Sequence, residues 1–212
     1  MTSLTQVNRA PGTDSRLQRL LETAAGCPLP EWDRVVSELE TIRIAAGATV
    51  FEQGVVHPYL YAVRQGLVKL CYLDEDGNEW IKSFSEEGRF FASIAALQPA
   101  GRTSFLVEAM EPTELERLAY PTLSALASQH LAWARAAQNM TMAFAARKEA
   151  RERDLLTLTP EGRYRAFLAD NPGLAQRIPR KTSPAIGRDR SASTASLVDC
   201  AANQAQHRIS RP

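Results

Sequence analysis

The chain has 212 residues, 44% of them hydrophobic, so it is long enough for one large or two small domains with a substantial core. Its 25 basic and 24 acidic side chains nearly balance, so any nucleic-acid-binding surface has to be local. The three cysteines, Cys27, Cys71 and Cys200, are isolated, which argues against a disulfide scaffold or a zinc or iron–sulfur site and fits a reducing cytoplasm. We read neither a signal peptide nor an apolar run of about 18 residues, so we expect no membrane partner.

The amino-terminal part begins with a polar arm and two short helices. Residues 1–15 are rich in Thr, Ser, Asn, Gly and Pro, and we expect a disordered arm there. A first helix is predicted from the spacing of Leu17, Leu20 and Leu21. A second begins at Pro30, because proline suits the first turn of a helix, and its apolar face is formed by Val35, Val36 and Leu39.

From Ile42 to Leu118 the pattern changes to short strands separated by turns. Glycines follow one another at intervals of 7, 12, 11 and 11 residues, at positions 47, 54, 66, 77 and 88. Short strands with turn signals about every 8–12 residues are typical of a β-sandwich or barrel.

Two pairs of strands stand out within this region. Residues 67–72 and 80–84 flank the turn signal Asp74-Glu75-Asp76-Gly77-Asn78, which predicts a hairpin. Residues 103–109 and 113–119 are predicted as two further strands, separated by a turn at Glu111-Pro112.

Pro121 opens an alanine-rich segment that reaches Leu156 without glycine or further proline, which predicts a long helix over residues 121–156. Its larger side chains follow a heptad-like spacing that is apolar at first and basic later, at Trp133, Ala137, Met140, Phe144, Arg147 and Arg151. The periodicity leaves two interpretations open. The stripe either pairs with a second copy of the chain or packs on the β-domain of its own chain.

The segment after this helix predicts another one. Thr159, Pro160 and Glu161 suit an N-cap and a first helical turn. The helix is expected to continue to Asp170, where Asn171-Pro172-Gly173 ends it.

The order of these motifs resembles the Crp/Fnr family of bacterial transcription regulators. The resemblance covers residues 17–181 and rests on the glycine spacing, on Gly88-Arg89-Phe90-Phe91 and Gly101-Arg102-Thr103, and on the segment 155–164. It implies an α+β fold with a cyclic-nucleotide-binding-like β jelly roll, a long dimerisation helix and a winged helix-turn-helix domain. The implied parts are a sensor domain at 16–120, a dimerisation helix at 121–156 and the start of the helix-turn-helix domain at 157–181.

The resemblance also implies a function and its surfaces. The expected function is that of a cytoplasmic, DNA-binding transcriptional regulator that senses an effector through its β-barrel. These regulators pair through the long helix, which favours the dimer interpretation of the stripe and assigns the homodimer interface to Trp133, Ala137, Met140 and Phe144. Promoter DNA is then the partner of the intact family form.

An effector pocket follows from the resemblance, residue by residue. In nucleotide-binding relatives a Gly-Glu pair after the Gly-x-Phe turn holds the ribose, and an Arg-Ser or Arg-Thr pair holds the cyclic phosphate. A guanidinium and exposed helical N–H groups suit a phosphate chemically. The corresponding positions in this chain are Gly88, Phe91, Ala92, Ser93, Arg102 and Thr103.

The Gly-Glu pair is replaced here by Ala92-Ser93, so the carboxylate for the ribose is missing. We therefore predict no tight binding of cyclic AMP and assign no cofactor. Arg102 is either a phosphate ligand or a solvated loop arginine. Haem-sensing relatives can place a thiolate ligand in the β-domain, but a single strand cysteine such as Cys71 is more often a core residue.

The family pattern ends after Lys181. Residues 182–212 hold no Phe, Tyr, Trp, Lys or Glu, and their four large aliphatic side chains are too few for a small core. No recognition helix is identifiable, and we expect a disordered tail. A shifted reading frame through this stretch yields a plausible recognition helix, so a frame slip is favoured over a naturally divergent tail.

Three classes of function were compared. The first is the Crp/Fnr-type regulator. The second is a sensor and dimerisation module that lacks sequence-specific DNA binding because its recognition helix is missing. The third is an enzyme on a jelly roll with a three-histidine metal site. It is disfavoured because the chain has only His57, His130 and His207, and the β-region holds no His-x-His with a following Glu, so a three-histidine site is unavailable there. No nucleophile–base pair is apparent either, so we expect no enzyme.

Overall fold

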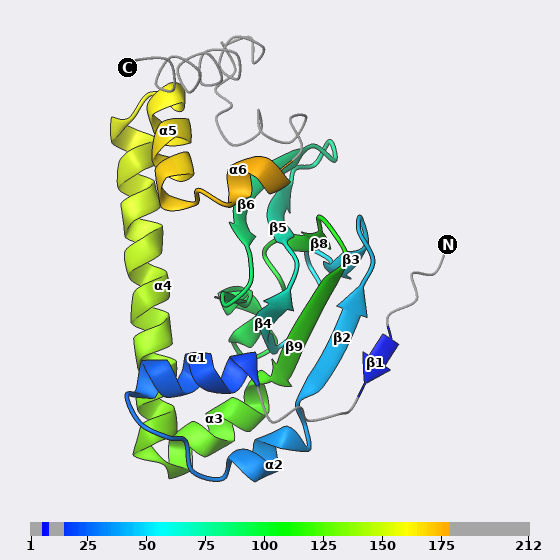
Figure 1. Cartoon of the computed structure of the whole chain (residues 1–212), viewed down its shortest axis with the longest axis vertical. Helices are drawn as coiled ribbons and strands as arrows, with labels where there is room; N and C mark the ends of the chain where they lie inside the picture. Colours follow the sequence, from blue (N-terminus) through cyan, green and yellow to red (C-terminus); the bar gives the residue numbers. More distant parts are fainter. Residues whose placement is uncertain (1–5, 9–14, 179–212) are drawn as a thin grey trace, which may run out of the picture. The chain divides into compact units, whose positions relative to one another are not determined.

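The computed structural model describes residues 6–8 and 15–178 and divides the chain into two compact units, Met1–Ala146 and Arg147–Pro212. The first unit holds two antiparallel sheets (Figure 1). Their strands are β1 (Gln6–Asn8), β2 (Glu40–Ile44), β3 (Thr49–Phe51), β4 (Tyr59–Gln65), β5 (Val68–Leu73), β6 (Glu79–Ser85), β7 (Phe90–Phe91), β8 (Leu106–Ala109) and β9 (Thr113–Ala119). The strand order is β1-β2-β9-β4-β7 in one sheet and β3-β8-β5-β6 in the other. This arrangement is the jelly roll that the sequence predicts.

The interior of the jelly roll is a single apolar cluster to which both sheets contribute. In β5, Val68 and Leu70 belong to it, and each faces a residue of the same cluster on β8, Ala109 and Val107. Alternate residues of a strand point to the same face of the sheet, so this pairing continues the apolar surface across the strands. The remaining buried members are Ile42, Ile44, Ala48, Phe51, Tyr61, Val63, Phe91, Phe105 and Leu115.

The predicted hairpin is confirmed. β5 pairs with β6 in antiparallel register, and the connecting turn is organised by Asp74, whose carboxylate accepts hydrogen bonds from the backbone N–H groups of Asp76 and Asn78. Gly77 adopts a positive φ of 79° in this turn. The register shifts opposite Leu70 and Cys71, which places Lys82 in a β-bulge of β6.

The predicted turn around Gly66 is also confirmed, and it requires glycine for two reasons. Its φ is 101°, which L-residues rarely adopt. A Cβ atom at this position would lie 2.4 Å from the Oγ1 atom of Thr113, the first residue of β9. Any side chain at position 66 would therefore push the β4–β5 connection away from β9.

Three helical elements cover one end of the jelly roll. Helix α1 (Arg16–Ala25) begins at Ser15, whose hydroxyl accepts from the Gln18 N–H, and α2 (Trp32–Val36) follows the predicted start at Pro30. Helix α3 (Tyr120–Gln129) follows β9 directly. A second apolar cluster joins these helices to β4, β9 and the next helix. Its buried members are Leu17, Leu21, Ala25, Leu29, Val35, Leu60, Ala62, Ala92, Leu118, Leu123, Leu126, Trp133, Ala136 and Met140.

The segment predicted as one helix over 121–156 contains two, α3 and α4 (Leu131–Thr157), which meet at His130. The backbone of His130 is extended, with φ −132° and ψ 124°, and its ring lies 2.8 Å from a carboxylate oxygen of Glu31. Leu126 of α3 and Trp133 of α4 are both buried in the second cluster. The break lets the two helices leave His130 in different directions while both pack against this cluster.

The start of the chain also differs from its predicted form. Within the arm assigned to residues 1–15, Gln6–Asn8 forms β1, which pairs with β2 in the register Gln6 to Arg43. Residues 1–5 and 9–14 lie outside the described part of the chain.

The second unit contains the end of α4, α5 (Pro160–Asp170) and α6 (Leu174–Arg177). The predicted N-cap is confirmed, since the Thr159 hydroxyl accepts a hydrogen bond of 3.1 Å from the Gly162 N–H. α5 is described over its whole length, and none of its side chains is buried. In the described residues of both units, no helix combines the length and the apolar character needed to cross a membrane.

Candidate functional site

The predicted effector pocket corresponds to one continuous segment that runs from the turn before β7, through β7, to the loop before β8. It starts at the turn of Gly88, whose N–H donates to the Val63 carbonyl at 3.1 Å, and passes through Phe91 into the short 3₁₀ helix η1 (Ile94–Leu97). It ends at Arg102 and Thr103. We call residues 88–103 the cassette. All six residues that the sequence assigns to the pocket lie in this segment, and the pocket itself stays a prediction.

Ser93 is hydrogen-bonded to Ser104, the residue that follows the cassette. Its side chain is buried, with 2% exposure, and its hydroxyl accepts a hydrogen bond of 3.1 Å from the Ser104 N–H. The loop between them packs tightly on η1, because a Cβ atom at Gly101 would lie 2.0 Å from the Ala95 carbonyl oxygen. Ser93, which the resemblance assigns to the Glu position of nucleotide-binding relatives, makes a structural hydrogen bond here and carries no charge.

Arg102 and Thr103, the predicted phosphate pair, have different environments. Thr103 is buried, and its hydroxyl donates to the Glu52 carbonyl at 2.5 Å and accepts from the Val55 N–H at 3.0 Å. Both of its hydrogen bonds hold the loop between β3 and β4. Arg102 is exposed and donates one guanidinium N–H to the carbonyl of Gly54 in the same loop, at 2.9 Å. Arg102 therefore presents a positive charge to solvent, whereas Thr103 is uncharged and buried.

Aromatic rings fill the barrel behind the cassette. Phe91 stacks on Tyr61 with ring centroids 4.9 Å apart and an interplanar angle of 2°. Phe51 lies 6.4 Å from Phe91 and 5.7 Å from Phe105. These four rings are at most 5% exposed. Their contacts join the predicted pocket residue Phe91 to the apolar core, where it acts as packing.

A polar chain borders these rings. The His57 ring nitrogen lies 2.7 Å from the Tyr61 hydroxyl. Burial, together with the positive charge of Arg117, lowers the pKa of His57 to about 4, so the imidazole is neutral at pH 7. Burial raises the pKa of Tyr61 to about 12. Arg117 is held by Glu40 at 2.7 Å and lies over the ring of Tyr59. No local sequence motif marks this group, because its members come from β2, β4, β9 and the loop before β4.

Lys82, in the bulge of β6, connects the barrel to α4. Its ammonium lies 4.7 Å from the ring centroid of Phe105, just after the cassette, and 5.5 Å from that of Phe144 on α4. A cation near the face of an aromatic ring is attracted by the ring quadrupole. Phe144, predicted as a dimer contact, therefore has a partner within its own chain.

The other predicted dimer residues also have partners in their own chain. Trp133 is fully buried and Met140 is 7% exposed, both within the cluster that α1 and α3 share, and Ala137 packs against that cluster. The Trp133 indole N–H donates to the Pro30 carbonyl at 2.9 Å, and its ring stacks on Trp32. No second chain is present, so the homodimer itself stays a prediction. Trp133, Ala137 and Met140 thus pack against the apolar cluster of their own chain, whereas Arg147 and Arg151 are exposed, and the assignment of the stripe to a dimer interface stays a prediction.

Cys71 is fully buried in β5, and burial raises the pKa of its thiol to about 11, so it stays protonated. This state fits a core residue. Among residues 6–8 and 15–178, no three His, Cys, Asp or Glu side chains come together as a possible metal site. The predicted tail at 182–212, with its unidentified recognition helix, lies outside the described residues.

Residues 41–130 match the family model of the cyclic nucleotide-binding domain. This part of the chain is a cyclic-nucleotide-binding-type domain, and the match covers β2 to α3, with the whole cassette. A comparison with curated protein sequences finds no match.

Solved structures of regulators share the fold over most of the chain. FixK2 from Bradyrhizobium japonicum has a TM-score of 0.64 and 17% identity, covering 80% of this chain and 85% of its own. The c-di-GMP-responsive global regulator CLP of Xanthomonas campestris has a TM-score of 0.64 and 16% identity, over 82% and 91%. The catabolite activator protein of Thermus thermophilus has a TM-score of 0.53 and 24% identity, over 91% and 90%. At such identities the likeness establishes the fold alone.

Proposed function

We propose that this chain is, in its intact form with an in-frame recognition helix, a Crp/Fnr-type transcriptional regulator whose β-barrel senses an effector and whose α4 helix forms a homodimer. The observation that carries the proposal is the continuous path from the cassette, through β8, β9 and α3, into the 27-residue helix α4. A cytoplasmic location accords with this role. The likeness to regulators of the same architecture supports the proposed regulatory role.

The effector differs from cyclic AMP bound in the known mode. The Thr103 hydroxyl both donates to and accepts from the loop of residues 52–55, so it cannot donate to a ligand without breaking a hydrogen bond. The Ser93 hydroxyl accepts from the Ser104 N–H, which leaves it one neutral O–H donor and no charge to offer a ligand. Arg102 remains as a cation that gives up a single exposed hydrogen bond to receive an anion. The cassette therefore favours an anionic effector that needs no ribose contact.

Titration calorimetry with cyclic AMP tests this assignment. We expect no sub-micromolar dissociation constant, because one neutral hydrogen bond contributes only about 0.5–1.5 kcal/mol. The matched variant is Ser93→Glu, which introduces the carboxylate that nucleotide-binding relatives use to hold the ribose. Sub-micromolar binding by the unmodified chain that is lost in Arg102→Ala would show that the pocket binds the nucleotide in the known mode.

The dimer seam is assigned to the outward face of α4. At about 100° per residue, Leu131, Gln138 and Met142 lie on the side of the helix opposite Trp133 and Met140. Leu131 is 74% exposed and Met142 is 63% exposed. Leu131 and Met142 are eleven residues apart, about three helical turns, so both exposed apolar side chains project from this one face. This seam replaces the inward stripe of the sequence analysis as the proposed interface.

A sensor and dimerisation module without sequence-specific DNA binding is the second candidate. One observation favours it: the first helix of a helix-turn-helix core buries one face, whereas α5 buries no side chain. Leu155 and Leu156, near the end of α4, are 61% and 78% exposed. Reading bases needs a rigid helix in the major groove, and the tail at 182–212 offers arginines in no recognisable helix pattern.

A gel-shift selection with random duplexes separates the two candidates. It compares this chain with a version whose reading frame is restored after Lys181. We expect the restored chain to select a palindromic motif, whereas the chain as given binds DNA weakly and in a salt-sensitive way, through phosphate contacts alone. A palindrome selected by this chain at physiological salt would exclude the second candidate. Failure of the restored chain to select any motif would contradict the proposed regulator.

A further inference from the structure

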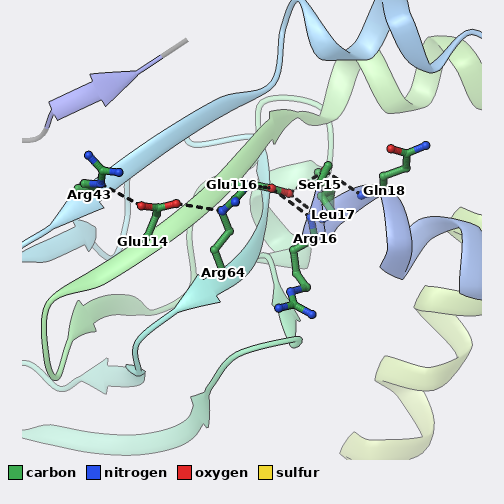
Figure 2. A network of polar contacts seen from close by, with 8 residues as sticks. All are labelled: Ser15, Arg16, Leu17, Gln18, Arg43, Arg64, Glu114 and Glu116. Carbon is green, nitrogen blue, oxygen red and sulfur yellow. Dashed lines mark hydrogen bonds and ion pairs between the residues drawn. The ribbon is translucent and has the colours of Figure 1, made fainter. Parts of the chain in front are cut away.

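The amino-terminal end of α1 is bound to one buried carboxylate (Figure 2). Glu116, in the middle of β9, is fully buried. It accepts hydrogen bonds from the Ser15 hydroxyl at 2.8 Å, the Leu17 N–H at 2.7 Å and the Arg16 N–H at 3.1 Å. The first N–H groups of a helix have no partner within the helix and favour negative charge. Glu116 therefore fixes the start of α1 to the sheet.

The same carboxylate is tied to the neighbouring strand. The Arg64 guanidinium, on β4, donates to Glu116 at 2.7 Å and also pairs with Glu114 at 2.9 Å (Figure 2). Glu114 in turn pairs with Arg43 on β2 at 2.9 Å. A buried carboxylate is stable only when its charge is compensated, and here the compensation comes from β4 and α1 together. Glu116 thus links β9, β4 and the start of α1 through one carboxylate.

The other end of α1 is attached to α4. The Ala24 carbonyl, in the last turn of α1, accepts from the side-chain amide of Asn139 at 2.8 Å. Farther along, the Pro30 carbonyl accepts from the Trp133 indole. Between these ends Leu17, Leu21 and Ala25 are buried in one cluster with Trp133, Ala136 and Met140. α1 thus meets the sheet at one end and the first half of α4 at the other.

We propose that α1 is a rigid strut that sets the position of α4 on the jelly roll, with Glu116 as the positioning residue at its base. Its use in signalling rests on the proposed function: an effector that moves β4 or β9 shifts α1, and α1 shifts the helix that forms the dimer. A packed element with discrete contacts at both ends transmits such a shift because close-packed interiors deform little.

Hydrogen exchange of the full chain, read by mass spectrometry, tests the strut. The variant is Glu116→Gln, which keeps the shape and removes the charge. The matched control is Glu114→Gln, two residues along the same strand, whose carboxylate pairs with Arg43 and Arg64. Because hydrogen bonds to a charged group are the stronger ones, we expect Glu116→Gln to speed exchange about tenfold in α1 and also in residues 132–146 of α4. Glu114→Gln should leave α4 at the wild-type rate.

Three results would overturn the proposal. Faster exchange in α1 with α4 unchanged would show that α4 is placed without α1. An equal effect of Glu114→Gln would assign the coupling to Arg64. An equal increase across β5, in the other sheet, would indicate a general loss of stability. If Glu116→Gln does not fold, Ser15→Ala removes one donor and must give the same pattern at smaller amplitude. The experiment uses neither effector nor DNA, so its outcome is independent of the gel-shift selection.

Discussion

The inner and outer faces of α4 carry the same kinds of side chain in different roles. Met140 faces inward and is 7% exposed, whereas Met142, two residues later, faces outward and is 63% exposed. Trp133 and Leu131 differ in the same way, at 0% and 74%. The inner face joins α4 to α1 and α3, while the outer face has apolar side chains in water. Hydrophobicity alone therefore does not separate a core helix from an interface helix.

The largest effect is expected at the outer face. The double variant Leu131→Glu with Met142→Glu should convert the dimer to a monomer, because it puts like charges on both sides of the proposed seam. Light scattering then reports half the mass. Ala143→Glu, exposed on the same helix but off this face, should leave the dimer intact. A dimer mass that survives the double variant, or a wild-type chain that is monomeric, would contradict the seam.

A pair of matched methionine truncations sharpens the comparison. Met140→Ala removes a buried side chain and should lower the free energy of unfolding by about 2–5 kcal/mol. In the Leu131→Glu background, which weakens the proposed seam, Met142→Ala removes a side chain that is exposed in the single chain, and the change should stay within about 0.5 kcal/mol. Urea unfolding of both variants at one protein concentration measures the difference. Equal losses in the free energy of unfolding would contradict the difference in burial between the two faces of α4.

The smallest effect is expected where the inner face meets the β6 bulge. Lys82→Met removes the cation from between Phe105 and Phe144, and such contacts contribute about 0.5–1 kcal/mol at partly exposed sites. A double-mutant cycle with Phe144→Leu isolates the contact, with unfolding free energies as the readout. Strictly additive losses would show that Lys82 and Phe144 are not coupled.

Much of the barrel could be predicted from local sequence. The strand 113–119 and the hairpin of β5 and β6 were expected from turn residues and from the spacing of short apolar runs. All five glycines that punctuate the region adopt positive φ, so the turns fall where the sequence breaks the strands. These features depend on a few neighbouring residues, which is why they can be recognised without the tertiary structure.

The cassette shows where such recognition ends. The resemblance assigns the pocket to this segment, but it could not tell that the Ser93 hydroxyl accepts from the Ser104 N–H or that the Thr103 hydroxyl is hydrogen-bonded to the loop of residues 52–55. Hydrogen-bond partners of a buried hydroxyl come from distant parts of the chain. The roles of Glu116 and His57 were missed for the same reason, since neither belongs to a local motif.

The sequence by itself determined the order of strands, turns and helices, because steric preferences of glycine and proline and the periodicity of apolar residues act over a few positions. The tertiary structure alone decided that the helical segment breaks at His130 and that Trp133 and Met140 face the core of their own chain. A heptad-like stripe has the same spacing whether it meets another chain or its own domain. Only the position of α1 and α3 beside α4 selects the face that is buried, and that position depends on contacts such as Glu116 with Leu17 that join residues about a hundred positions apart.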